Sequence, residues 1–221
     1  MSRLALRNGV VAVLSAATLA VAGCTGSGGG QPPTATSSTS ASPGLSQDQL
    51  LAKIPLNGSA RVPISWRLAR QDDPVVQAAR RFLSLNEVLA SSTDVKPLVP
   101  LIDAVSTGTA RQVAHSVWDS AKPSGRLALG PLWIWLDTPV RQATGTVVVP
   151  VCRDIGWWDS DGKPAAPRHG DRASVESLTL VGERTDDGPP RWKVTTYAPK
   201  ADKAVTSAFA ASCQAWSNHK P

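Results

Sequence analysis

Apolar residues follow three patterns along the chain, and each predicts a different kind of structure. From residue 10 to residue 22 nearly every position is apolar. From 74 to 91 and from 109 to 118, apolar residues recur every three or four positions, which is typical of an amphipathic helix. From 132 to 183 they alternate with polar residues or form β-branched runs, which favours strands.

The clearest predicted helix begins after Asp72-Asp73-Pro74, because an acidic residue at the cap and a proline at the first helical position both favour a helix start. Its apolar face is expected to be covered, and Arg80, Arg81 and Glu87 are expected on the opposite polar face. Residues 96–105 contain two prolines and predict a short, broken helix at most.

Two further helix starts carry a capping-box pattern. The first is Ser-x-x-Gln at 46–49, which begins a short helix to residue 52. The second is Thr109-Ala110-Arg111-Gln112, which is expected to place Val113, Ala114, Val117 and Trp118 on one face. Strands are predicted over 132–137, 144–152, 173–183 and 191–197, and a closing helix over 200–216.

Helices followed by a meander of strands predict an α+β fold, with the N-terminal helices packed on a curved antiparallel sheet and a helix added at the C-terminus. Residues 46–221 are enough for one globular domain with a proper core. A cystatin-like α+β fold is the alternative.

The N-terminus has the features of an export signal. Arg3 and Arg7 precede the apolar run, small residues follow it, and residues 1–23 are therefore interpreted as a signal peptide. The run is shorter than the roughly 20 apolar residues of a membrane span. Residues 24–45 contain mostly Gly, Ser, Thr, Pro and Ala, and predict a flexible linker.

Val21-Ala22-Gly23-Cys24 resembles the lipobox of bacterial lipoproteins, and the Arg-, Ala- and Trp-rich composition resembles that of actinobacterial ones. The resemblance implies cleavage before Cys24, attachment of palmitate and other acyl chains to it, and a place on the outer face of the cytoplasmic membrane. An ordinary secretory signal with a chance cysteine is the alternative.

Cys152 and Cys213 form an even pair in an exported chain and are predicted to form a disulfide. Arg153, beside the first cysteine, is interpreted as a surface residue. Three histidines without a Cys-x-x-Cys pair give no support for a metal site, and no cofactor motif is present. The net charge of +6 is not gathered into a stripe, and an exported domain is not expected to bind nucleic acid.

From about residue 72 to 197 the chain resembles the nuclear-transport-factor-two-like superfamily, a cone of helices and curved sheet. The resemblance rests on the order of elements, the strand end at Val151-Cys152-Arg153-Asp154, the Asp-Gly-Lys-Pro turn at 161–164 and the final strand Arg-Trp-Lys-Val at 191–194. It implies a cone interior that binds a ligand or, in isomerases and dehydratases, works with an acid or a histidine.

Two groups are candidates for that interior. Trp133, Trp135 and Asp137 are predicted to share one face of a strand, which would line a pocket if that face is concave; otherwise both indoles are core and Asp137 opens a turn. His115 and Asp119 lie four apart on a helix, as a catalytic pair or as part of a solvated stripe with Arg111. His169 and His219 are interpreted as unconstrained.

Trp157 and Trp158 are adjacent, so their indoles are expected on opposite faces of the sheet, with one facing outward as an interaction edge or lying under a loop. Three functions follow: a lipid-anchored domain that binds an envelope component or an apolar small molecule, an isomerase- or dehydratase-type enzyme using Asp137 or His115, and a scaffold for an envelope protein through Trp157 and Trp158. Binding is preferred over catalysis.

Overall fold

The computed structural model describes residues 45–119, 127–159, 172–186, 188–198 and 203–221. All of them belong to one compact unit, Pro43–Pro221. Among these residues, no helix combines the length and the apolar character that crossing a bilayer requires.

The described residues form an α+β fold, as predicted. The helices are α1 (Gln47–Ala52), α2 (Pro74–Ser91), the 3-10 turn η1 (Lys96–Leu98), α3 (Val99–Val105), α4 (Gly108–Asp119) and α5 (Lys203–Trp216). The predicted caps are confirmed at two of them. Asp73 accepts a hydrogen bond from the Val75 amide at the start of α2, and Ser46 and Gln49 form a capping box at α1.

The sheet has the strand order β1-β2-β4-β5-β6, and β3 pairs with β4 off this path. The strands are β1 (Ile64–Leu68), β2 (Leu132–Leu136), β3 (Val140–Arg141), β4 (Val147–Asp154), β5 (Ala173–Glu183) and β6 (Arg191–Ala198). Each pairing is antiparallel except that of β1 with β2, which is parallel.

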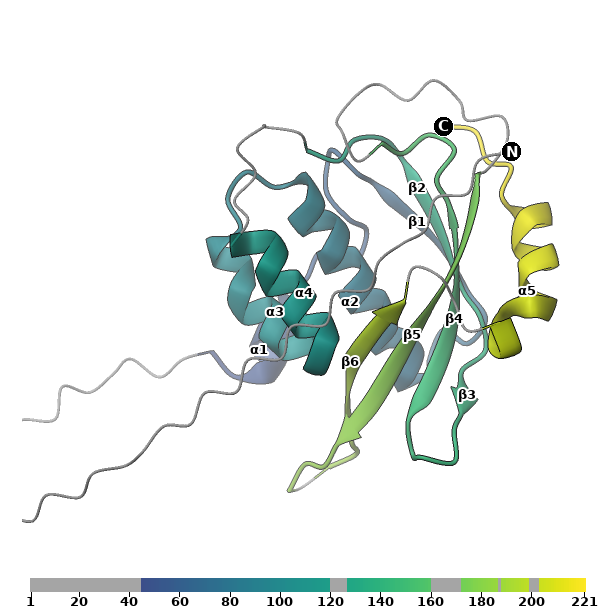
Figure 1. Cartoon of the computed structure of the whole chain (residues 1–221). Helices are drawn as coiled ribbons and strands as arrows, with labels where there is room; N and C mark the ends of the chain where they lie inside the picture. Colours follow the sequence, from purple (N-terminus) through teal and green to yellow (C-terminus); the bar gives the residue numbers. More distant parts are fainter. Residues whose placement is uncertain (1–44, 120–126, 160–171, 187, 199–202) are drawn as a thin grey trace, which may run out of the picture. The chain divides into compact units, whose positions relative to one another are not determined.

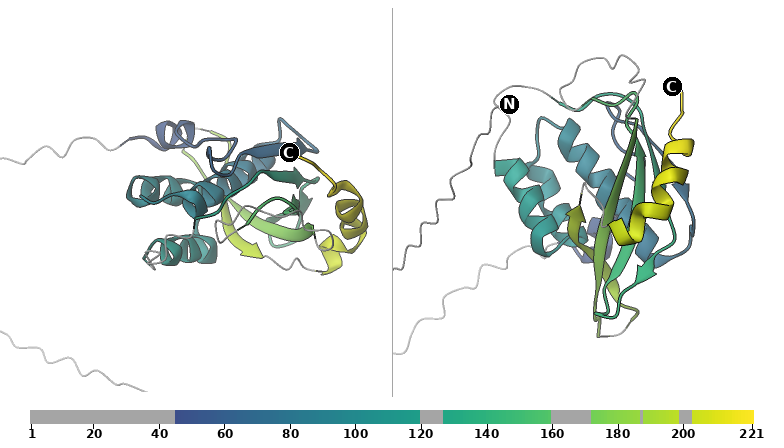
Figure 2. Two further views of the ribbon diagram at one scale, coloured as in Figure 1. Left: turned by 90° about the horizontal axis from the view of Figure 1, so that it is seen from above. Right: turned by 45° about the vertical axis from the view of Figure 1, so that its right-hand side comes forward.

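Helices cover both faces of this sheet. Figures 1 and 2 show α1 to α4 on one face, called here the helical face, and α5 on the other, called the α5 face. On β2, Leu132, Ile134 and Leu136 are fully buried on the helical face, where α2 and α3 supply most of the facing core. The core thus lies between α1–α4 and the sheet, and a second, smaller cluster lies under α5.

Three details differ from the sequence expectation. Strand β1 was not predicted, and it lies at the sheet edge beside β2. Helix α4 begins at Gly108, whose φ of +54° suits glycine, and Thr109 donates its hydroxyl hydrogen to the Thr195 carbonyl instead of capping the helix. Val113 was expected on the covered face of this helix but is 59% exposed.

Candidate functional site

The predicted disulfide between Cys152 and Cys213 is present, with a Cα–Cα distance of 5.5 Å. It joins β4 to α5 across 61 residues of sequence. Around it, the Trp135 ring packs edge-on against Phe209 and Trp216. The bond therefore fixes α5 on its face of the sheet.

The two residues that follow Cys152 in β4 extend to opposite faces, as neighbours in a strand do. Arg153 lies on the helical face and Asp154 lies on the α5 face, and both are buried. Each is the centre of a polar cluster, and the two clusters hold different segments of the chain.

The Arg153 cluster contains Arg153, Glu87, Glu176, Tyr197 and Trp158. The guanidinium lies 2.6 Å from a Glu87 oxygen and 3.4 Å from a Glu176 oxygen. Tyr197 donates its hydroxyl hydrogen to Glu176 at 2.5 Å, and the Trp158 indole N–H donates to Glu87 at 3.1 Å. The guanidinium carbon also lies 5.1 Å from the Trp158 ring centre. The cluster thereby links α2 to β4, β5 and β6.

Burial sets the electrostatics of this cluster. Burial raises the pKa of Glu87, against the pull of the Arg153 guanidinium. Burial also acts to lower the pKa of Arg153, but Glu87 and Glu176 outweigh it and raise that pKa. The pKa of Tyr197 is raised by burial and, in spite of Arg153, by Glu176. Arg153 is therefore a permanent buried cation.

The Arg153 cluster corrects two sequence interpretations. Arg153 was expected on the surface but is 7% exposed, and Glu87 was expected on a solvated face but is 1% exposed. Glu87 accepts hydrogen bonds from Arg153 and Trp158, and Glu176 accepts hydrogen bonds from Arg153 and Tyr197. Neither carboxylate is therefore a free general acid or base. Of the three guanidinium nitrogens of Arg153, Nε has no hydrogen-bond partner among the described residues.

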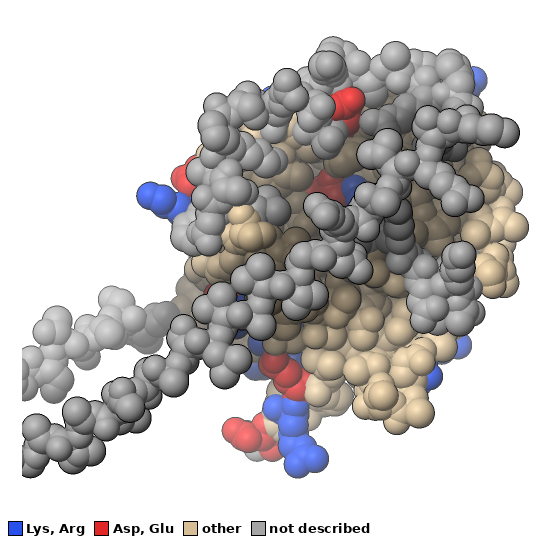
Figure 3. Space-filling model, viewed as in Figure 1, with Lys and Arg blue, Asp and Glu red and all other residues tan. Residues whose placement is uncertain are grey.

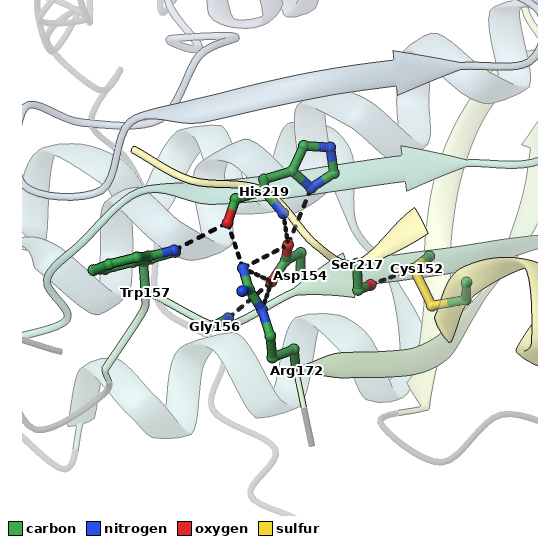
Figure 4. Close-up of polar contacts among 8 residues, drawn as sticks. Cys152, Asp154, Gly156, Trp157, Arg172, Ser217 and His219 are labelled. Carbon is green, nitrogen blue, oxygen red and sulfur yellow. Dashed lines mark hydrogen bonds and ion pairs between the residues drawn. A yellow bond between two sulfur atoms is a disulfide. The ribbon is translucent and has the colours of Figure 1, made fainter. Parts of the chain in front are cut away.

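The Asp154 cluster holds the end of the chain, residues 217–221 (Figure 4). Asp154 accepts hydrogen bonds from the Gly156 amide at 2.9 Å and from the His219 amide at 3.0 Å. His219 Nδ1 lies 3.0 Å from the same carboxylate, and Arg172 lies 3.2 Å from it. The His219 carbonyl in turn accepts from the Trp157 indole at 3.0 Å and from Arg172 at 2.5 Å.

These contacts also decide the charge state of Asp154. Burial acts to raise its pKa, but hydrogen bonds from His219 and Gly156, together with the charge of Arg172, lower that pKa overall. Asp154 is therefore held as a carboxylate. The interpretation of His219 as unconstrained is wrong, whereas His169 lies outside the described residues.

The predicted aromatic wall does not line the core between the helices and the sheet. Trp133 and Trp135 do share a face, but it is the α5 face, and both side chains are half-buried there. The Trp133 ring stacks on His219 with centres 5.1 Å apart, while Trp135 packs under α5. Asp137 is half-buried, and its amide donates to the Pro150 carbonyl. The contacts therefore agree with the alternative in which both indoles are packed within the fold.

The predicted catalytic pair is not in the interior either. His115 Nε2 lies 2.9 Å from the Asp103 carboxylate of α3, which Arg111 also approaches at 3.5 Å. Half of the Asp103 side chain is exposed, so this is a surface group of charges. The side chain of Asp119 lies outside the described residues. Within the described ranges, no three His, Cys, Asp or Glu side chains are placed to hold a metal.

Trp157 and Trp158 do extend to opposite sides, as expected for neighbours. The Trp157 indole N–H donates a hydrogen bond to the His219 carbonyl, and the Trp158 indole N–H donates one to the Glu87 carboxylate of α2. Both are half-buried and occupied within the molecule. Of the two alternatives for the outer indole, the structure therefore favours contacts within the molecule over an interaction edge.

A mostly apolar depression of about 310 Å³, called here the α1–α2 groove, lies beside the first helix. It is bounded by α1, the first half of α2, the end of α3 and the β5–β6 hairpin. It is lined by Gln47, Leu51, Pro74, Gln77, Ala78, Arg81, Ala104, Val105, Pro190, Arg191 and Trp192. Its volume is at the lower end of the range for ligand sites, about 300 to 1,000 Å³.

Two arginines of the groove differ in their contacts. Arg191 reaches α1, where it lies 3.3 Å from both Asp48 and Gln47. Arg81 is half-buried and has no hydrogen-bond or ion-pair partner among the described residues. In Figure 3, acidic and basic atoms gather over the β5–β6 hairpin, where the ion pairs Arg191–Asp48 and Lys193–Glu183 form.

Sequence reasoning missed this groove, because its walls come from segments far apart in the chain. The one local indication of the groove in the sequence is the spacing of residues 74, 77, 78 and 81, which places them on one face of a helix. Cys24 and the rest of residues 1–44 lie outside the described residues. No family model, curated protein or solved structure matches the chain.

Proposed function

We propose that this protein is a lipid-anchored binding protein on the outer face of the bacterial cytoplasmic membrane, and that it binds through the α1–α2 groove without catalysing a reaction. The sequence supports the location, through the export signal, the lipobox-like Val21-Ala22-Gly23-Cys24 and the linker after it. The Cys152–Cys213 disulfide supports it too, because such bonds persist in oxidising compartments.

The observation that carries the binding proposal is the contrast between the groove and the interior. The groove has half-buried apolar side chains at Trp192 and Leu51 and an unpaired cation at Arg81. A few polar groups beside apolar walls are the usual composition of a binding site. The interior acids Glu87 and Glu176 are engaged by neighbouring side chains, so neither of them is free to accept a substrate proton.

The fold supports the same proposal. Helices α1 to α4 on one face of a mostly antiparallel sheet agree with a cone of the nuclear-transport-factor-two-like type, which is our assignment of the superfamily, and α5 is an addition on the other face. In this chain the space between helices and sheet is filled by the apolar core and the Arg153 cluster. Binding is therefore proposed at the open end beside α1.

The anchor is tested by detergent phase separation of the full chain expressed in an actinobacterial host. The wild-type protein is expected in the detergent phase, with acyl chains on Cys24 by mass spectrometry. Cys24→Ala is expected to lose the acyl mass and move to the aqueous phase, because each buried methylene contributes about 0.8 kcal/mol to membrane binding. A wild-type chain without acyl mass would refute the anchor.

Groove binding is tested by what co-purifies with the protein from its host. Gln77→Trp places an indole in the groove from a half-exposed position, and Gln112→Trp makes the same change at an exposed position of α4. Organic extracts of wild type and Gln112→Trp are expected to share a molecule that Gln77→Trp lacks. Identical extracts from all three proteins would contradict binding in the groove.

A further inference from the structure

We infer that the α1–α2 groove holds one apolar chain of an anionic membrane lipid, whose headgroup is bound by Arg81. The inference rests on the proposed function and adds the class of ligand. It follows from the shape of the groove, from its charge and from the place where the linker enters the domain.

The groove has two unlike sides. One side is a stripe of α2 formed by Pro74, Gln77, Ala78 and Arg81, which follow one another at three- and four-residue intervals. The other side is formed by apolar groups of three other elements, listed from α1 to β6 as Leu51, Ala104, Val105, Pro190 and Trp192. At about 310 Å³ the groove suits a chain segment and not a whole phospholipid.

The charge of the groove favours a single anionic group. Asp48 neutralises Arg191 across the gap between α1 and the hairpin. Arg81 remains as the cation without an acidic partner among the described lining residues. A guanidinium recognises phosphate or carboxylate through paired N–H donors, so an anion at the end of an apolar chain fits both parts of the groove.

The place of the groove favours a membrane source for that lipid. Helix α1, which supplies Gln47 and Leu51, is the first element of the described chain. About 20 residues separate it from Cys24, and a flexible linker of that length has a mean span of about 25 Å. An acylated Cys24 would therefore keep the groove near the headgroups, where basic residues are attracted to anionic lipids.

The test uses the chain from residue 24 onward with Cys24→Ser, which removes the anchor and keeps the whole core of residues 54–213. Co-sedimentation is measured with vesicles of phosphatidylcholine alone and of phosphatidylcholine with one third phosphatidylglycerol. Binding is expected only to the second. Arg81→Gln is expected to weaken it about fivefold, and Arg61→Gln, at an exposed position outside the groove, is expected to have a smaller effect.

The apolar part of the inference is tested with the tryptophan variants on the same vesicles. Gln77→Trp is expected to weaken binding at least as much as Arg81→Gln, although it changes no charge. Gln112→Trp is expected to bind like wild type. Thermal melting of each variant shows whether the domain is still folded.

Three results would overturn the inference. Equal losses in Arg81→Gln and Arg61→Gln, with no loss in Gln77→Trp, would mean a general surface charge effect. Vesicle binding independent of all four variants would place the contact elsewhere. No vesicle binding, combined with a co-purified molecule that Gln77→Trp lacks, would mean a soluble ligand, which leaves the proposed function standing and removes the lipid.

Discussion

Arg153 and Asp154 are neighbours in β4, yet they organise the two faces of the sheet in opposite ways. On the helical face one cation is shared by two carboxylates, Glu87 and Glu176. On the α5 face one carboxylate is shared by several donors, mainly from Arg172 and His219. The first cluster joins elements that already belong to the core, and the second holds a terminal segment.

The difference shows in how each charge is stabilised. In the Arg153 cluster, burial outweighs the attraction of the Arg153 guanidinium, Glu176 adds repulsion, and the pKa of Glu87 is raised. The Asp154 cluster has more donors than acceptors, so hydrogen bonds dominate and the pKa of Asp154 is lowered. The fold therefore disfavours the charged form of Glu87 on one side of the sheet and favours that of Asp154 on the other.

The largest effect is expected from Arg153→Met. It leaves Glu87 and Glu176 buried without their cation, and removing one partner of a buried ion pair typically costs about 3 to 5 kcal/mol of unfolding free energy. Urea unfolding followed by tryptophan fluorescence measures the loss. Arg61→Met, at an exposed position, is the control and is expected to stay within about 0.5 kcal/mol.

A second set of variants separates lost charge from lost packing in that cluster. Adding Glu87→Gln and Glu176→Gln to Arg153→Met removes both unpaired charges and is expected to recover part of the stability. If the triple variant is as unstable as Arg153→Met alone, the arginine acts through packing and not through its charge.

Removing the disulfide is expected to cost about 4 kcal/mol, because a bond that closes a loop of this size restricts the unfolded chain. The loop here spans 61 residues. The double variant Cys152→Ala and Cys213→Ala is compared with wild type by urea unfolding. Unchanged stability would show that the contacts of Trp135 with Phe209 and Trp216 hold α5 without the bond.

Asp154→Asn is expected to cost about 2 kcal/mol at neutral pH, since hydrogen bonds to charged groups contribute about 1.5 to 3 kcal/mol. The folded state lowers the pKa of Asp154, so its stabilisation is present above the unfolded value near pH 4 and is lost as the pH falls through the folded value. The difference between Asp154→Asn and wild type should therefore shrink below about pH 4.

Glu87 gives the opposite pH dependence to Asp154, because the fold raises the pKa of Glu87 and lowers the pKa of Asp154. The folded state raises the pKa of Glu87, so it keeps a proton where the unfolded chain has lost one. Its contribution to stability then falls as the pH rises above about 4. Glu87→Gln should remove that slope, and an unchanged pH profile would contradict the assignment.

The smallest effect is expected from His219→Ala, about 1 kcal/mol or less, because the backbone amide of residue 219 can still donate to Asp154. Hydrogen exchange should increase at residues 217–219 and stay unchanged in α2. Faster exchange in α2 as well would mean that the two clusters are coupled through β4.

Local patterns predicted much of the fold. The Asp73 cap and apolar spacing of α2, the strands of the meander and the disulfide were all accessible, because each depends on residue types at short spacing or on an even cysteine pair. Strand β1 was missed although ISWRL alternates between apolar and polar residues, because the segment is only five residues long and its parallel partner β2 begins some 60 residues later.

The candidate site was less predictable for one physical reason. Alternation placed Trp133 and Trp135 on a common face but could not say which face would be covered, since α5 and His219 come from the far end of the chain. Arg153 and Glu87 resembled surface residues for the same reason. Charged side chains are seldom buried, and only the fold brings the partners that permit it.

The alternation of Cys152, Arg153 and Asp154 also protects the chain against pairing errors while it folds. A slip of β4 by one residue would turn each side chain to the other face. Asp154 would then lie beside Glu87 and Glu176, Arg153 would lie beside Arg172, and Cys152 would be turned away from Cys213. These three consecutive residues thus make the mispaired sheet electrostatically unfavourable. They also restrict formation of the Cys152–Cys213 disulfide to the native register of β4.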